Sequence, residues 1–126
     1  MPRLNAIGIV TSEMARSIRF YRLLGLDVPD TPDEGHIDTF LPNGVRFMLD
    51  GEEVIRSFRA DWTRATGNQI GIAFECDSAG EVDETYRRVV EAGFHGEKEP
   101  WDAFWGQRYA QLRDPDGVGV DLYAAL

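Results

Sequence analysis

Apolar and polar residues follow an order that occurs twice along this chain. In the first half, residues 4–10 read as a strand, and helically spaced apolar residues then form one stripe: Met14, Ile18, Tyr21 and Leu24. We expect a hydroxyl of Thr11 or Ser12 to cap this helix, because it can accept a free backbone N–H, and we expect Gly25 to end it. Residues 36–41 and 45–50 alternate as two further strands, which a tight turn joins at Pro42-Asn43-Gly44.

The second half repeats this plan. Residues 70–76 predict a strand, and Ser78 and Glu81 have the spacing of a capping box at the start of the next helix. The apolar stripe of that helix comprises Val82, Tyr86, Val89 and Val90, and Gly93 marks its end. Three strands are expected after it, at 94–99, 107–113 and 118–124, the last two joined through Asp114-Pro115-Asp116-Gly117.

An internal repeat determines the fold prediction. Each half reads β-α-β-β(-β), and neither half of about 60 residues buries its sheet well by itself. We therefore predict an α+β fold in which two tandem βαβββ modules form one curved mixed sheet, with a cleft on its inner face and helices on its outer face. The predicted single domain 1–126 contains module one (4–50), a connecting segment (51–69) and module two (70–125). The connecting segment is either a short helical excursion or a loop over a site.

Composition narrows the function classes. The 126 residues carry a formal net charge of −9, which disfavours nucleic acid as a partner, since phosphate neutralisation needs a basic face. The acidity either suits a cationic small molecule or only keeps the protein soluble. No apolar run approaches membrane-spanning length and no secretory signal is visible, so no membrane partner is expected. The single cysteine excludes an internal disulfide and favours a cytoplasmic location.

Two segments of the chain have a distinctive sequence. One runs from Ile9 to Gly25 and contains Ala15-Arg16-Ser17-Ile18-Arg19-Phe20-Tyr21. The other is Arg113-Asp114-Pro115-Asp116-Gly117 followed by a strand with an acid at its centre. Together they resemble the vicinal oxygen chelate superfamily, which includes glyoxalases, bleomycin-resistance proteins and extradiol dioxygenases. The resemblance covers essentially the whole chain and implies the fold, whereas the superfamily hosts isomerases, thiol transferases, dioxygenases and drug-sequestering proteins on one scaffold.

In enzymes of this superfamily a divalent metal sits in the cleft. The resemblance carries its ligand positions onto Ala6, Met48, Gly71 and Asp121. Only Asp121 suits such a cation, because Ala6 and Gly71 have no ligand atom and the thioether of Met48 is soft. Glu75 lies about 13 Å along the strand from Gly71 and cannot replace it. The histidines, His36 and His95, fall on no ligand position and are expected to be hydrogen-bonding surface residues. We therefore expect no metal, no other cofactor and no residue assigned to catalysis.

Three aromatic residues cluster in a predicted connection between strands: Trp101, Phe104 and Trp105. They form either a stacking wall for a planar ligand or a local hydrophobic cluster or dimer contact. Strand alternation places Asp121 and Tyr123 on one face, where Asp121 can act as a counter-ion for a basic ligand group. The parity of Cys76 directs it towards the helix layer as an inert buried thiol. The candidate ligand-binding residues are Phe47, Met48, Trp62, Trp101, Trp105, Tyr109, Asp121 and Tyr123.

These observations favour a metal-independent protein that binds a small aromatic or cationic molecule in the cleft and acts as a homodimer. Its closest analogy is the antibiotic-sequestering, bleomycin-resistance-like branch, in which no turnover occurs. The alternative is a glyoxalase- or dioxygenase-type lyase or isomerase with an unorthodox or metal-dependent site, using groups such as Asp121, Glu75 and Tyr109. A third class is a structural or regulatory dimer whose cleft is filled by its own side chains.

Overall fold

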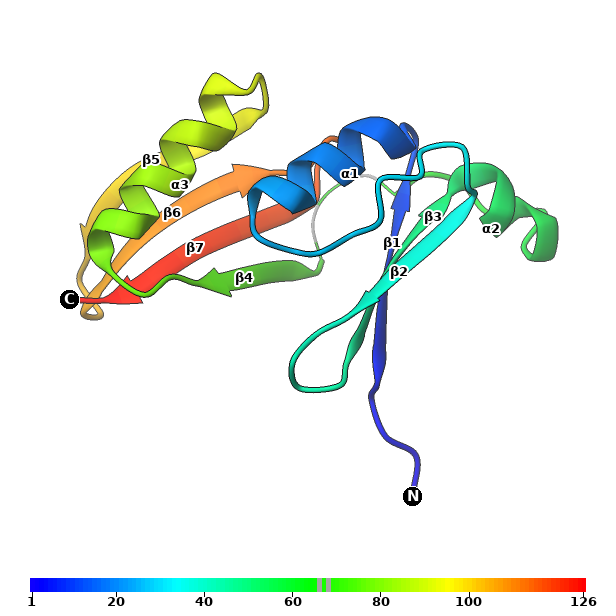
Figure 1. The fold of residues 1–126 in the computed structure, drawn as a ribbon, viewed down its shortest axis with the longest axis horizontal. Helices are drawn as coiled ribbons and strands as arrows, with labels where there is room; N and C mark the ends of the chain where they lie inside the picture. Colours follow the sequence, from blue (N-terminus) through cyan, green and yellow to red (C-terminus); the bar gives the residue numbers. More distant parts are fainter. Residues whose placement is uncertain (66, 68) are drawn as a thin grey trace. The chain divides into compact units, whose positions relative to one another are not determined.

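A computed structural model of the chain describes residues 1–65, 67 and 69–126 (Figure 1). The chain divides into two compact units, Met1–Ala65 and Thr66–Leu126. The predicted joining of the two modules into one curved sheet with a cleft concerns their relative placement, and it stays a prediction.

The first unit contains β1 (Ala6–Thr11), α1 (Met14–Leu23), β2 (His36–Phe40), β3 (Arg46–Gly51) and α2 (Glu52–Phe58). Its sheet has the order β1-β3-β2, with β1 parallel and β2 antiparallel to β3. The turn between β2 and β3 forms as predicted, because Gly44 has φ +84° and its N–H donates to the carbonyl of Leu41 at 2.9 Å. The first half of the repeat is therefore a βαββ module.

The core of the first unit lies between α1 and one face of its sheet. Ile9, Ile37 and Leu49 lie in one cross-strand row and are all buried. The stripe of α1 supplies Ile18 and Tyr21, both fully buried. The 3.6-residue period of the helix and the two-residue period of the strands thus meet on one apolar layer, as the sequence predicts.

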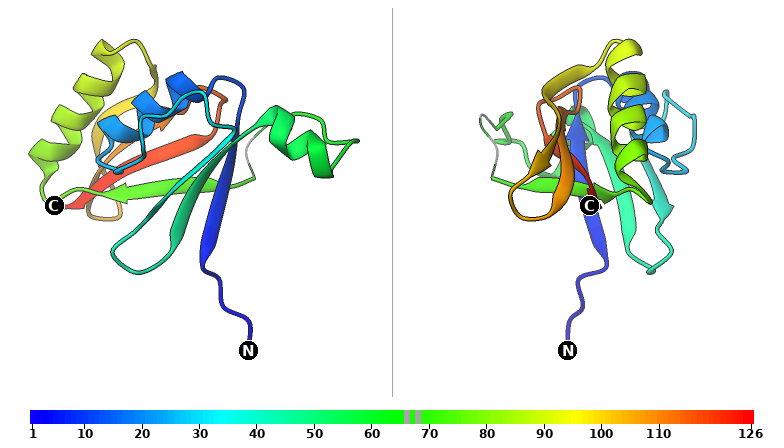
Figure 2. Two further views of the ribbon diagram at one scale, coloured as in Figure 1. Left: turned by 45° about the vertical axis from the view of Figure 1, so that its right-hand side comes forward. Right: turned by 90° about the vertical axis from the view of Figure 1, so that its left-hand side faces the viewer.

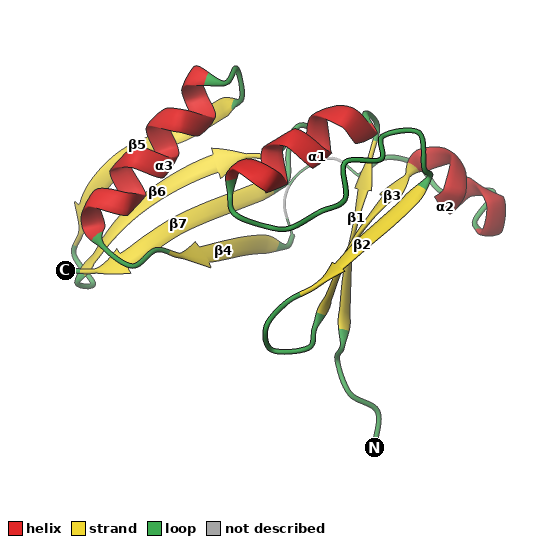
Figure 3. Cartoon of the chain, in the orientation of Figure 1, coloured by secondary structure: helices red, strands yellow, loops and turns green. Residues whose placement is uncertain are grey.

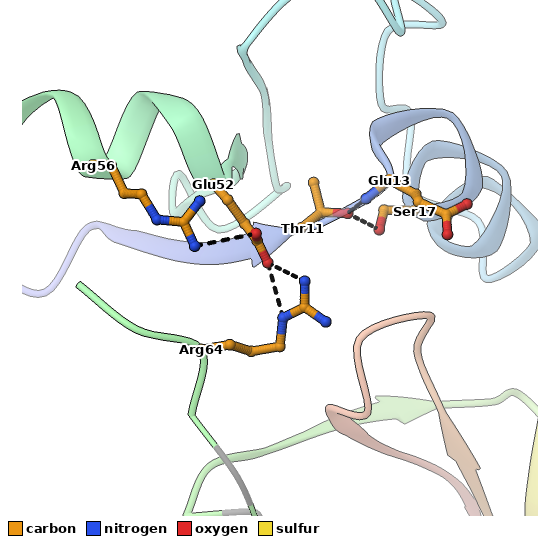
Figure 4. A network of polar contacts seen from close by, with 6 residues as sticks. All are labelled: Thr11, Glu13, Ser17, Glu52, Arg56 and Arg64. Carbon is orange, nitrogen blue, oxygen red and sulfur yellow. Dashed lines mark hydrogen bonds and ion pairs between the residues drawn. The ribbon is translucent and has the colours of Figure 1, made fainter. Parts of the chain in front are cut away.

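The predicted cap of α1 is confirmed in part, because the hydroxyl of Thr11 accepts a backbone N–H before the helix. The N-cap residue is Glu13, and its side chain forms no capping hydrogen bond. Strand β1 continues through Thr11, whose buried hydroxyl accepts the N–H of Glu13 at 3.1 Å and lies 2.6 Å from the hydroxyl of Ser17 (Figure 4). Thr11 thereby connects the end of the strand to the first turn of the helix.

The connecting segment 51–69 begins as a helical excursion, α2. It includes residues 66 and 68, which lie outside the described residues. Arg64, six residues after α2, donates from Nε to Glu52 Oε1 at 2.9 Å, and Arg56 reaches the other oxygen of the same carboxylate (Figure 4). The chain after α2 therefore returns to the first turn of that helix.

The second unit contains β4 (Gly71–Glu75), α3 (Ala79–Glu91), β5 (His95–Ala103), β6 (Gln107–Arg113) and β7 (Gly119–Ala125). Its sheet has the order β4-β7-β6-β5, in which β4 is parallel to β7 and the other neighbours are antiparallel. Helix α3 covers one face of this sheet and contacts β5, β6 and β7 (Figures 2 and 3). This is the βαβββ module that the pattern predicts.

The predicted helix cap and the predicted turn of the second unit both form. Ser78 Oγ accepts the N–H of Glu81 at 3.1 Å, and the Glu81 carboxylate accepts the N–H of Asp77, one residue before the position of a standard capping box. In the turn before β7, the buried Asp114 carboxylate accepts the N–H groups of Asp116 and Val118, both at 2.9 Å. Gly117 closes that turn at φ +90°.

The placement of the aromatic cluster in a connection is partly wrong. Strand β5 continues to Ala103, beyond the predicted end at 99, so Trp101 lies in the sheet and only Phe104 and Trp105 lie in the turn. Two register irregularities, on either side of Lys98, interrupt the alternation of β5, and Pro100 reads as a strand breaker. A bulged strand therefore looks like a loop in the sequence.

The strand registers confirm the internal repeat. Ala6 pairs with the residue two before Met48, and Gly71 pairs with the residue two before Asp121. The ligand positions that the resemblance implies are therefore equivalent in the two modules, Ala6 to Gly71 and Met48 to Asp121. Among the described residues, no helix has the length and apolar character needed to cross a membrane.

Candidate functional site: an aromatic face with one carboxylate

The face of the second sheet that lies opposite α3 carries most of the candidate residues. Arg108 donates to Asp83 of α3 at 2.8 Å, so even-numbered residues of β6 point towards the helix. Odd-numbered residues therefore point away from α3, because strand side chains alternate between faces. The register aligns Trp101, Tyr109 and Tyr123 across β5, β6 and β7. We call these three residues the aromatic row.

The rings of this face contact one another. Trp101 and Tyr109 lie 5.4 Å apart between centroids, and Tyr109 stacks on Tyr123 at 6.4 Å. Trp105 packs edge-on against both Trp101 and Tyr109, and its indole N–H donates to Gln107 Oε1 at 2.8 Å. Aromatic pairs in such geometry contribute about 0.5–1.5 kcal/mol each beyond the area they bury. The row is thus held in place from within the second unit.

Asp121 lies next to the aromatic row and is bound to it. The Tyr109 hydroxyl donates to Asp121 Oδ2 at 2.5 Å. Burial and this hydrogen bond raise the pKa of Tyr109 to about 12. Tyr109 therefore stays a neutral phenol near pH 7 and acts as a donor, whereas the second oxygen of Asp121 can accept a hydrogen bond from a ligand.

A titration tests this pairing. We expect Tyr109 to ionise near pH 12, as measured by tyrosinate absorbance in the wild type minus Tyr109→Phe. Asp121→Ala should lower this pKa but leave it above 10, because burial, the larger cause, remains. Because the pKa of Tyr109 is higher in the folded than in the unfolded state, its neutral form stabilises the folded state. This contribution is fully present below the unfolded pKa of about 10 and is lost as the pH rises towards 12. An unchanged Tyr109 pKa in Asp121→Ala would contradict the assignment.

Two glycines leave the backbone uncovered by side chains beside Asp121 on the same face. Gly71 and Gly119 are register partners, and no atom of the described residues lies within 4 Å of the point where a side chain would begin at either glycine. Ala73, the next residue of β4 on this face, pairs with Asp121. The aromatic row and Asp121 therefore border a strip of open backbone.

The donor set does not fit the divalent metal that the fold family implies. Of its four ligand positions only Asp121 offers an oxygen, and the Tyr109 hydroxyl already binds one of its two oxygens. In the described part of the chain, no group of three or more His, Cys, Asp or Glu side chains is placed to hold an ion.

The candidate ligand-binding residues of the first unit do not share one face. Met48 lies on the face opposite α1, where its Cε is 3.3 Å from the point at which a Gly8 side chain would begin, so it covers the backbone of Gly8. Phe47 is buried against Tyr21, at 4.9 Å between ring centroids, and is a core residue instead of a lining residue. Its neighbour in sequence, Met48, has the opposite parity, so the two do not share a surface. Trp62 lies under the Arg56 guanidinium at 5.1 Å.

Two other predicted roles are confirmed. His36 is an exposed residue of β2 whose Nδ1 lies 2.5 Å from Asp50, and this hydrogen bond raises its pKa above the ordinary value. Cys76 is buried, and burial raises the pKa of its thiol, which suits an unreactive core cysteine.

The sequence-based set misses Lys98. Its ammonium nitrogen lies 3.9 Å from the centroid of the Trp101 ring, within the range of a cation–π interaction. One signal could have identified it, because Lys98 is the only lysine in the chain. The bulge in β5 concealed the face on which it lies.

The comparison with family models identifies the class of protein. The model of the Glyoxalase/Bleomycin resistance protein/Dioxygenase superfamily matches residues 3–122, and the chain belongs to this superfamily. No curated protein matches the sequence.

Solved structures show the same fold. A glyoxalase/bleomycin resistance protein/dioxygenase from Nocardioides is 25% identical, with a TM-score of 0.76, and the alignment covers 100% of this chain and 85% of that one. A family enzyme from Burkholderia phytofirmans PsJN is 17% identical with a TM-score of 0.84, covering 99% and 100%. A glyoxalase-related enzyme from Fulvimarina pelagi is 17% identical with a TM-score of 0.82, covering 98% and 88%.

Proposed function

We propose that this protein binds a small, planar aromatic or cationic molecule on the aromatic face of its second unit, without a metal and without turnover. The closest functional analogy within the superfamily is antibiotic sequestration of the bleomycin-resistance type. The single observation that carries the proposal is the aromatic row beside Asp121, which borders the open backbone at Gly71 and Gly119.

Physical chemistry supports this assignment. Ligand sites combine apolar and aromatic walls with a few well-placed polar groups. Here the rings offer stacking surface, and the carboxylate offers one acceptor for a basic group. The net charge of −9 attracts a cation over a longer range. Metal independence is supported by the donor set, which supplies one carboxylate at the four ligand positions.

The alternative is a lyase or isomerase that uses Tyr109 and Asp121 for proton transfer, and their close hydrogen bond favours it. The raised pKa of Tyr109 opposes a role as a base near neutral pH, because the phenol keeps its proton. Turnover of a bound ligand, seen as a change in its mass after incubation, would favour this alternative over sequestration.

Two further parts of the proposal concern the location of the protein in the cell and its oligomeric state. We propose a cytoplasmic protein, which the single free cysteine Cys76 supports. We also propose a homodimer, and Phe104 supports it, because its side chain is 97% exposed at the outer end of the aromatic cluster.

The first test fills the open backbone. Gly119→Val places a branched side chain beside Asp121 without a clash, and valine suits a strand. We expect it to weaken binding of 9-aminoacridine, a planar cation, at least tenfold in calorimetry while the melting temperature holds or rises. Ala125→Val, at the exposed end of β7, is the matched control and should bind like the wild type.

Native mass spectrometry with Fe(II), Ni(II), Zn(II) and Mn(II) accompanies this measurement. Stoichiometric binding of one metal per chain that Asp121→Ala abolishes would overturn metal independence. Equal affinity of Gly119→Val and the wild type would overturn the location of the site.

A further inference from the structure

A second polar feature lies beside the aromatic row. The strand register places Lys98 opposite Gln111, and Gln111 opposite Asp121, across β5, β6 and β7. We call these three residues the polar row. It runs parallel to the aromatic row on the face opposite α3, because Gln111 and Asp121 share the parity of Tyr109 and Tyr123.

The two ends of the polar row carry opposite charges. Asp121 is the carboxylate described above, and Lys98 ends the row with an ammonium. Two strand spacings separate their backbones, which is about 10 Å. An aromatic ring system that lies along the aromatic row therefore meets a cation near Trp101 and an anion near Tyr109.

Lys98 differs from the arginines near it. Arg108 is paired with Asp83 and Asp102, and Arg113 is paired with Glu97. Within the described part of the chain, the Lys98 ammonium lies over the Trp101 ring, so its positive charge faces a π system instead of a carboxylate. A lysine also presents a compact charge on a flexible stem that can turn towards an incoming group.

This layout changes the expected ligand chemistry. A ligand that carries only a positive group is attracted by Asp121 and repelled by Lys98. A ligand that carries an anionic and a cationic group at opposite ends of a planar aromatic system gains a charge-assisted contact at each end.

From this layout we infer that Lys98 determines specificity and selects an amphoteric aromatic ligand, whose anionic group it binds while Asp121 binds the basic group. The inference rests on the proposed function, since it concerns the charge of a ligand bound at the same face.

The test uses three forms of one planar ring system. Norfloxacin is a zwitterion with a carboxylate and a piperazine ammonium at opposite ends, its ethyl ester keeps only the cation, and its N-acetyl form keeps only the anion. Calorimetry would measure all three against the wild type, Lys98→Gln and Lys98→Arg. Lys98 is exposed, so neither substitution should disturb folding.

We expect the wild type to bind the zwitterion about tenfold more tightly than the ester, the effect of one charge-assisted contact. Lys98→Gln should lose this preference, and Lys98→Arg should keep most of it. A second readout uses the fact that the chain has one lysine. Acetylation of its ε-amine, followed by peptide mass spectrometry, should slow when the zwitterion is bound and not when the ester is bound.

Two results overturn the inference and leave the proposed function intact. In the first, the wild type and Lys98→Gln bind all three forms equally. In the second, the wild type shows no preference for the zwitterion, and Lys98→Gln binds the ester more tightly than the wild type does. If the wild type binds none of the three forms and no 9-aminoacridine, the proposed function fails, and the inference fails with it.

Discussion

Replacing Tyr21 by alanine is expected to lower the free energy of unfolding by about 3–5 kcal/mol. Tyr21 is fully buried, and its ring contacts Phe20 at 5.0 Å and Phe47 at 4.9 Å between centroids. Removing the ring loses its buried apolar area and leaves a cavity between α1 and the first sheet. Urea denaturation followed by far-UV circular dichroism measures the loss.

The internal repeat supplies the matched control. Tyr86 occupies the equivalent position of α3 but is only half-buried, and its ring lies over the backbone of Gly96 on β5. Tyr86→Ala should therefore cost roughly 1–2 kcal/mol, since less area returns to water. Equal losses in the two variants would show that burial at the Tyr21 position does not stabilise the fold as described.

The second large effect is on binding. Trp101→Ala should weaken the affinity for 9-aminoacridine about thirtyfold, which corresponds to roughly 2 kcal/mol. Trp101 contacts Trp105, Tyr109 and the Lys98 ammonium, so it lies between the aromatic row and the basic end of the polar row. Its loss removes a stacking surface and frees a positive charge beside the site. Calorimetry and quenching of the remaining tryptophans measure the change.

Phe104→Ala is the control for this variant. Phe104 is 97% exposed and packs its ring against Trp105 in the turn after β5. It should change affinity less than twofold, in the range of a surface substitution. If Phe104→Ala weakens binding as much as Trp101→Ala, the ligand contacts the turn instead of the aromatic row.

The sequence predicts the secondary structure well where local signals are strong. Gly25, Gly44, Gly93 and Gly117 all adopt positive φ, as expected of glycines that end a helix or form a tight turn. The boundaries of β6 were predicted at both ends, because its alternation is regular. The α1 cap was predicted in part: the hydroxyl of Thr11 accepts the N–H of Glu13 and contacts Ser17, but the strand runs on through Thr11 and the N-cap residue is Glu13.

The candidate site was predicted in part. The two-residue period put Asp121 and Tyr123 on one face, and both lie beside Tyr109, as the alternation requires. The same period excludes Phe47 from the face of Met48, and Phe47 is a core residue. The contribution of Trp101 to the sheet and the position of Lys98 could not be read, because the bulges of β5 break the period.

What the sequence alone determined is the repeat, the α+β class, the superfamily and the absence of ligand atoms at Ala6 and Gly71, because each depends on residue identity and short-range spacing. What only the tertiary structure decided is which side chains meet across strands. The Tyr109–Asp121 hydrogen bond, the aromatic row and the polar row join residues on different strands, and their partners are fixed by strand register. The alternation and the turns favour one register, but the bulges of β5 shift the pairing locally, and these shifts could not be read from the alternation of the sequence.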